Sequence, residues 1–382
     1  MSSNAWEHPS LIAAEGLMHL EDALILGALV TRDKTNEFTS GSMKIGDTVN
    51  MRTSPDYEAR EFTNDGTQTI VKQAIRSSVR PFVIEKIFDV SVEVTAREKK
   101  LDLDAFSEQV IAPAAYRLAE KVDKYIGTKI TDAAGLYASN TLYSSAADMA
   151  LARKAATLQQ LDPMSRISLV NLDLEATLLG QTWFNQSQTR GAPGISTLQT
   201  GNMGQVMGMN FVSSINFPVA AHTASGGTTT IDSAVATDNL IGLSTLTVDS
   251  ITGGFTAGDR IQVAGLRRPL IVKTTVAAAG VAIVLVDPIT EIIEDGAAVT
   301  VIGSGQSLSY NGAIFDSRSL AMAMPLLDAP SDKPSAVVSN NGYSIRMVQG
   351  YDIDKKVEVM SLDVMCGAVA WDPRKITLLA DY

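Results

Sequence analysis

Histidine and cysteine side chains, with which many enzymes do acid–base or nucleophilic chemistry, are scarce in this sequence. The three histidines are His8, His19 and His222, and the single cysteine is Cys366. A Ser-His-Asp or Cys-His centre would have to use one of these histidines, and two of them lie close to the N-terminus. Cys366 stands in the apolar stretch VMCGAVAW, where no neighbour in sequence would favour a thiolate. The sequence therefore predicts a buried, inert thiol and no catalytic histidine.

Three short groups of acidic residues are spaced like caps and turns rather than like a catalytic pair. The groups are Asp102 with Asp104, Asp352 with Asp354, and Glu291 with Glu294 and Asp295. The last group could bind a cation or could be a solvated turn. We find no Walker phosphate loop, dinucleotide-binding GxGxxG, HExxH or EF-hand loop. We therefore expect no catalytic residue, no cofactor and no metal, and the balance favours an interaction or structural protein.

The composition is that of a globular protein large enough for two or three domains. The chain has 382 residues, of which 45% are hydrophobic, and its formal net charge is −11. An acidic chain is poorly suited to binding nucleic acid electrostatically. There is no apolar run of membrane-spanning length and no basic-then-apolar signal peptide at the start, which predicts synthesis in the cytoplasm.

One long amphipathic helix is predicted over Asp104–Gly127. Its apolar residues recur every fourth position: Phe106, Val110, Ala114, Leu118, Val122 and Ile126. Asp104 is the expected N-cap, and Gly127 is expected to end the helix. Pro113 removes a backbone donor and should bend the helix near its first third. A helix with one apolar face needs a sheet to pack against, and the remaining sequence supplies mainly strands.

Residues 43–80 are predicted to form an extended hairpin around a polar tip, with a strong turn signal at Asn64-Asp65-Gly66. Such a hairpin has little core of its own, so we expect it to bury its surface on another subunit. The candidate intersubunit contacts in it are Asp56, Tyr57, Glu58, Arg60, Glu61 and Phe62.

Residues 222–305 differ in character, with about six short β segments separated by turns, which suggests an inserted barrel or sandwich. Arg267 and Arg268 stand at a predicted turn there, where they either contact an acidic surface on a neighbour or are solvated. The apolar stretch Ala313–Met324 after the insertion can form a helix, ended by Pro325.

The N-terminal arm, residues 1–42, can form one or two short amphipathic helices. They either dock on the chain's own body or contact a neighbouring subunit or a basic partner protein. The acidic residues that could bind such a basic partner are Glu7, Glu15, Glu21 and Asp22.

The order of these parts, together with three short motifs, resembles the major capsid proteins of tailed bacteriophages. The motifs are KIGDTVNMR at 44–52, APAAYRLAEKVD from Ala112 to Asp123, and the closing GYD…LDV…G. The similarity is greatest to the coat-protein branch of the Hong-Kong-97-type fold, which carries an insertion domain. It implies an α+β fold with these parts: arm 1–42, extended loop 43–80, peripheral domain 81–164 with spine helix 103–127, apical domain 165–221 and 306–370, β-barrel insertion domain 222–305, and C-terminal strand 371–382.

The resemblance also implies a function. Such a protein is not an enzyme and assembles as hexamers and pentamers into an icosahedral shell around double-stranded DNA. Its expected partners are further copies of itself, a basic scaffolding protein that would bind the acidic residues of the arm, a portal and a decoration protein. It would be made in the host bacterial cytoplasm and would reside in the virion. The alternatives are an encapsulin-like cellular shell protein and, in another class, a β-rich carbohydrate-binding or adhesive module, which the aromatic content of 6% disfavours.

Overall fold

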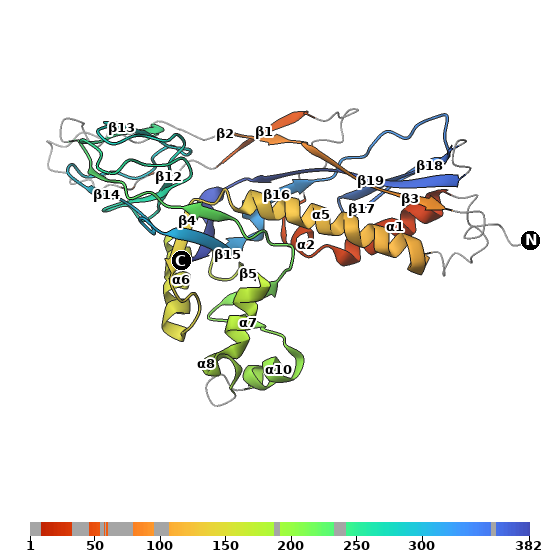
Figure 1. Ribbon diagram of the computed structural model, residues 1–382, viewed down its shortest axis with the longest axis horizontal. Coiled ribbons are helices and arrows are strands. Elements are labelled where there is room, and N and C mark those ends of the chain that lie inside the picture. Colours follow the sequence, from red (N-terminus) through yellow and green to blue (C-terminus); the bar gives the residue numbers. More distant parts are fainter. Residues whose placement is uncertain are drawn as a thin grey trace, which may run out of the picture.

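The structure is a computed structural model, and it describes residues 9–32, 46–53, 57, 59, 79–94, 107–186, 192–232, 242–352 and 357–382. It is an α+β structure with many strands and few helices. Figure 1 shows a part at one end that combines helices α1 and α5 with long strands, a group of short strands at the other end, and a smaller helical lobe below. The α+β class expected from the sequence is confirmed.

The predicted long helix is present, but its C-terminal end lies at Ile130 rather than at Gly127. A π-helical stretch, η3 (Ser107–Ile111), leads into α5 (Ala112–Ile130). Pro113 lies in the first turn of α5, directly after this π-helical stretch. Gly127 does not end the helix. It lies where α5 passes Pro218, and a Cβ at this position would overlap Pro218 Cδ. The predicted N-cap, Asp104, is outside the described residues.

The spine sheet, as we call it, has five antiparallel strands in the order β16-β19-β18-β17, with β3 paired on the other edge of β19. Its strands are β3 (Lys86–Val94), β16 (Leu320–Ala323), β17 (Ser335–Asn340), β18 (Tyr343–Asp352) and β19 (Val357–Ala370). Helix α5, with α1 (Pro9–Ala23) and the short α2 (Leu26–Leu29), covers one face, where Met360, Leu362 and Val364 of β19 join the main core.

Among the residues that the structure describes, only the ribbon and its neighbours cover the opposite face of the spine sheet. The two-stranded ribbon of β1 (Thr48–Arg52) and β2 (Val79–Val83) packs Met51 and Phe82 against Met365 of β19. Side chains alternate along a strand, so Asp363 and Ser361 of β19 point to this same face beyond the ribbon. We call the stretch of this face from Asp363 toward Val357 the open face.

A second sheet has the order β4-β20-β15-β5-β7-β6, with β8 paired to β15. Its strands are β4 (Gly135–Ser139), β5 (Arg166–Val170), β6 (Gln205–Val206), β7 (Met209–Ser213), β8 (Ala221–Thr223), β15 (Ser307–Asp316) and β20 (Ile376–Asp381). The helices around it are α6 (Ala146–Leu158), α7 (Leu172–Gly180), α8 (Thr182–Asn185) and α10 (Ala192–Thr200).

The helix predicted over Ala313–Met324 was wrong. These residues form the end of β15, a short 3-10 turn at Ser317–Ser319, and β16. Strand β15 lies between β20 and β5 and is buried on both faces, which gives a continuous apolar run. Such a run has no period that separates a buried strand from a buried helix.

Between β8 and β15 the chain forms the β module, which we define as strands β9 to β14 and the loops between them. Its strands are β9 (Thr228–Thr230), β10 (Thr245–Thr247), β11 (Arg260–Val263), β12 (Leu270–Ile271), β13 (Ala282–Val284) and β14 (Ala298–Val301). Four of them form a sheet in the order β12-β11-β14-β9, and β10 pairs with β13. Leu246, Phe255, Ile261 and Ile283 are almost fully buried and supply its core.

Candidate assembly surfaces and the anchor of the β module

One cluster contains the residue types of a serine hydrolase but not its arrangement. His222 Nε2 lies 2.8 Å from Asp259 Oδ1, and Ser225 Oγ donates to Asp259 Oδ2 at 2.6 Å. Both groups therefore bind the same carboxylate, and this arrangement does not pair a nucleophile with a base. Burial acts to raise the pKa of Asp259, but hydrogen bonds from His222, Ser225 and the Thr256 amide outweigh it, and the pKa is lowered. The cluster ties β8 to the β module.

The other candidates for chemistry are also structural. His19 Nε2 lies 3.0 Å from Ser107 Oγ, a contact between α1 and η3, and His8 is outside the described residues. Cys366 is fully buried, which confirms the expected burial, and burial raises the pKa of its thiol to about 12. The part of the chain that the structure describes contains no group of three or more His, Cys, Asp or Glu side chains placed to hold a metal ion. None of its helices is long and apolar enough to cross a membrane.

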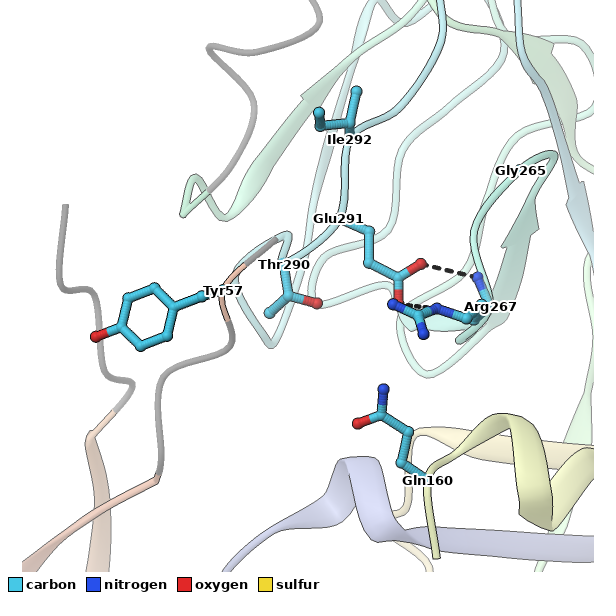
Figure 2. Close-up of a pocket in the computed structure, with 7 residues that line it drawn as sticks. All are labelled: Tyr57, Gln160, Gly265, Arg267, Thr290, Glu291 and Ile292. Atoms are coloured by element: carbon cyan, nitrogen blue, oxygen red, sulfur yellow. Dashed lines mark hydrogen bonds and ion pairs between the residues drawn. The ribbon is translucent and has the colours of Figure 1, made fainter. Parts of the chain in front are cut away.

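Tyr57 and Arg267, two of the predicted intersubunit contacts, line the same cavity of about 570 Å³. Arg267 Nε lies 3.3 Å from Glu291 Oε1, and its backbone amide donates to Glu291 Oε2 at 3.0 Å. Figure 2 shows these two side chains on one wall, Gln160 facing them from below, and the Tyr57 ring turned away from them. Tyr57 is 57% exposed and the Arg267 side chain is 61% exposed, so both are open to a neighbour.

The remaining predicted contacts separate into two groups. Arg268 is buried, and its Nη2 donates to Gln160 Oε1, so within the subunit it attaches the β module to the turn after α6. The sequence treated Arg267 and Arg268 alike, whereas only Arg267 has an exposed side chain. The others lie outside the described residues: Asp56, Glu58, Arg60, Glu61 and Phe62.

Arg260, which the sequence analysis did not single out, is the main anchor of the β module. Its Nη2 donates to Thr131 O at 2.6 Å and to Ala133 O at 3.1 Å, just beyond the C-terminus of α5. Its Nη1 donates to Tyr310 Oη at 2.7 Å and to Gly258 O at 3.0 Å. One guanidinium thus satisfies carbonyls at a helix end, where backbone acceptors have no helical partner, and joins them to β15.

A second contact connects the β module to the β1–β2 ribbon. Arg80 of β2 forms an ion pair with Asp287 of the module, and both side chains are largely buried. Besides its links to β8 and β15, the module is therefore fixed to the end of α5, to the turn after α6 and to the β1–β2 ribbon.

Comparison with known proteins gave matches only among solved structures, because no protein-family model and no curated protein matches this chain. A chain from Mycobacterium phage Che8 is 13% identical, with a TM-score of 0.52, over 93% of this chain and 90% of that one. The capsid of cyanophage P-SCSP1u is 12% identical, with a TM-score of 0.45, over 89% and 85% of the two chains. The mature capsid of bacteriophage PhiM1 is 11% identical, with a TM-score of 0.45, over 87% and 81%.

The chain has a phage capsid fold. The likeness to the Che8 chain extends over nearly the whole length of both chains.

Within this capsid fold the N-terminal helices are docked on the chain's own body. Asp123 of α5 is buried, and its two carboxylate oxygens accept from the amides of Ile25 and Gly27, each at 3.0 Å. Burial raises the pKa of Asp123, and the hydrogen bonds from these amides oppose that effect. The sequence contained one signal for this contact, because Asp123 is an acidic residue on the apolar face of the helix.

The acidic residues predicted to bind a scaffolding protein occupy different positions around α1. Glu15 accepts from Ser107 Oγ at 3.0 Å, and Glu21 accepts from Asn341 Nδ2 at 2.6 Å. Asp22 is exposed, and Glu7 is outside the described residues. Scaffold binding by these residues stays a prediction.

Gly367 of β19 is required where β2 crosses the spine sheet of this capsid fold. A Cβ at this position would lie 2.8 Å from Val83 O and 3.2 Å from Ile84 Cα. Because both atoms belong to the backbone of β2 and the residue after it, we expect Gly367→Ala to displace the ribbon and lower the free energy of unfolding by about 1–3 kcal/mol. Urea unfolding followed by fluorescence should show this loss, since Trp371 Nε1 donates to Arg52 O of the ribbon at 3.2 Å.

Gly350→Ala in β18 is the matched control, because an added Cβ there meets nothing within 4 Å. Equal stability of the two variants would show that the close approach at Gly367 does not restrict the ribbon.

Proposed function

We propose that this chain is the major capsid protein of a tailed phage, which assembles into an icosahedral shell around double-stranded DNA. The observation that supports this most strongly is the likeness to the Che8 chain, because it extends over 93% of this chain and 90% of that one. The protein acts mechanically rather than as an enzyme. Its subunits form hexamers and pentamers in the Hong-Kong-97-type manner and reside in the virion after assembly in the host bacterial cytoplasm.

The proposed role assigns a task to each part of the chain. Residues 43–80 form the extended loop that lies on a neighbouring subunit, with Tyr57 and Arg267 among its contacts. The β1–β2 ribbon supports this assignment, because Phe82 holds its base against the spine sheet and Arg80 holds it against the β module. Residues 81–164 form the peripheral domain, residues 165–221 and 306–370 the apical domain, and residues 222–305 the insertion domain.

The net charge of −11 is consistent with a protein that encloses DNA without condensing on it. A repeated contact between different patches of identical subunits closes into rings and shells when its rotation allows closure. The further partners that we propose are a scaffolding protein bound at the acidic arm, a portal and a decoration protein.

Electron microscopy of the purified full-length chain tests this function directly. We expect closed shells of uniform curvature when the chain is expressed alone or together with a candidate scaffolding protein from the same genome. A chain that stays monomeric or dimeric in both samples, over a range of salt and protein concentrations, would contradict the proposal. Shells that contain a protein cargo in place of DNA during phage growth would assign an encapsulin-like function instead.

Two variants connect this test to the proposed contacts. Tyr57→Ser and Arg267→Glu alter exposed side chains beside the cavity in Figure 2 and should reduce shell yield without changing the thermal unfolding of the subunit. Thr290→Ser, at the same cavity, is the control that should assemble normally.

A further inference from the structure

Two aspartates face each other on the open face of the spine sheet. Asp89 of β3 and Asp363 of β19 are direct partners in the antiparallel register, and Arg346 of β18 is the partner of Asp363 on its other side. Asp363 is 6% exposed. Like charges directly opposite each other in a sheet destabilise the pairing, so two ionised carboxylates at this position would push β3 away from β19.

The hydrogen bonds around the two carboxyl groups require an additional proton. Ser361 Oγ lies 2.5 Å from Asp89 Oδ1 and 2.8 Å from Asp363 Oδ1. A hydroxyl has one hydrogen to donate, and an ionised carboxylate has none. If both aspartates were ionised, one of these two contacts of Ser361 Oγ would contain no hydrogen. A single proton on the pair supplies the missing donor.

The charges facing the pair lead to the same conclusion. Arg346 donates to Asp363 Oδ2 from Nε at 3.0 Å and from Nη2 at 2.5 Å, and its Nη1 donates to Asp328 O. Farther along the same face are Glu93 of β3, opposite Val359, and Asp352 at the end of β18. Helices α1 and α5 pack on the other face of the sheet. One guanidinium beside two carboxyl groups gives a neutral cluster only when those groups hold one proton.

We propose that Asp89 and Asp363 share one proton and form a pH-sensitive clasp that holds β3 on β19. The clasp is closed while the proton is bound and loosens when it is lost. Strand β3 is the segment between the β1–β2 ribbon and the spine helix. Loosening it therefore weakens the connection between the predicted hairpin and the body of the subunit.

The direction of the titration follows from the two environments. Burial first, and then the hydrogen bond with Asp89, raise the pKa of Asp363 above its ordinary value of 3.8. Burial also acts to raise the pKa of Asp89, but hydrogen bonds from Asp363, Ser361 and Ser91 outweigh it, and that pKa is lowered. Because the shared proton is held more tightly in the closed clasp than in the open one, its stabilisation is present at low pH. It is lost as the pH rises from the ordinary value through the raised one.

Hydrogen exchange of the β3 amides tests the clasp in the full-length chain, with each rate corrected for the intrinsic effect of pH on exchange. In the wild type we expect the opening constant of β3 to increase by up to about tenfold per pH unit between the ordinary and the raised pKa, and then to level off. In Asp89→Asn an amide donates to Asp363 at every pH, so the opening constant should be low and independent of pH over this range. Glu93→Gln removes a carboxylate from the same strand but leaves the pair intact, and it should keep the wild-type profile.

Two further measurements complete the test. Asp363→Asn replaces the carboxyl group on β19, so the opening constant of β3 should again be independent of pH, even though the contact with Arg346 is weaker. A wild-type pH dependence that persists in either folded asparagine variant would overturn the proposal. Loss of protection when a chelator is added would show that a cation, not a proton, joins the two carboxylates, and would overturn it as well.

Discussion

Replacing Arg260 with methionine is expected to lower the free energy of unfolding by about 3–5 kcal/mol, because it leaves buried acceptors without a donor. The guanidinium donates to Thr131 O, Ala133 O, Gly258 O and Tyr310 Oη. Methionine has a similar length and fills much of the space, so the loss reports the hydrogen bonds rather than a cavity. Urea unfolding should give the loss of stability, and limited proteolysis should show earlier cleavage between the β module and the rest of the chain.

Two controls separate this interpretation from a general effect of removing an arginine. Arg260→Lys keeps the charge, but a single ammonium group cannot reach acceptors on both sides of the planar fork, so we expect it to recover only part of the lost stability. Arg267→Ala removes an exposed partner of Glu291 and should change stability by less than about 1 kcal/mol. If Arg260→Met were as stable as Arg267→Ala, the anchor would have to lie elsewhere in the module.

Substitution of Asp123 by alanine should detach the N-terminal helices from α5 and lower the free energy of unfolding by about 2–4 kcal/mol. The amides of Ile25 and Gly27 each donate to this carboxylate, and an unsatisfied buried donor costs about 1–3 kcal/mol. The segment from Pro9 to Val30 is held partly by these bonds, because α2 has no side-chain cap of its own. Hydrogen exchange should become faster at the amides of Ile25 and Gly27 and along α1. This increase in exchange rate should be larger than any increase in the β module.

Asp22→Ala is the matched control for Asp123→Ala, since Asp22 is an exposed carboxylate on the segment that would detach. We expect it to change stability by no more than about 0.5 kcal/mol. Asp123→Asn preserves the shape and one acceptor oxygen and should fall between the two. Unchanged protection of α1 in Asp123→Ala would mean that the apolar contacts of α1 alone hold it in place.

The sequence predicted the fold best where the spacing of apolar or turn residues fits only one type of secondary structure. The fourfold spacing in the spine helix and the regular turns of the β module could be interpreted without tertiary information. The limits of the helix could not, because the role of Gly127 depends on Pro218, which is distant in sequence and adjacent only in the folded chain. Strand β15 was mistaken for a helix because burial on both faces removes the alternation that identifies a strand.

The functional surfaces were less predictable for a related reason. Arg267 and Arg268 are neighbours in sequence, yet one side chain points to solvent and the other into the subunit. Nothing in the local pattern of Arg260 distinguishes it from a solvated strand residue, since its partners come from α5 and β15. Asp89 and Asp363 become a pair only through the register of β3 on β19. Contacts of this kind are set by topology, and local spacing carries no information about them.

The two ends of the β module are joined to one hydrogen-bonded pair of strands. Ala221–Thr223 of β8 lies directly against Ser307–Ser309 of β15, so the chain leaves and re-enters the second sheet at the same point. Paired residues in an antiparallel ladder are about 5 Å apart, a gap that a short turn can bridge. The insertion can therefore be shortened, exchanged or replaced by a foreign sequence while the ends it joins stay in place. A shell built from such subunits has a ready position for grafting new surface properties.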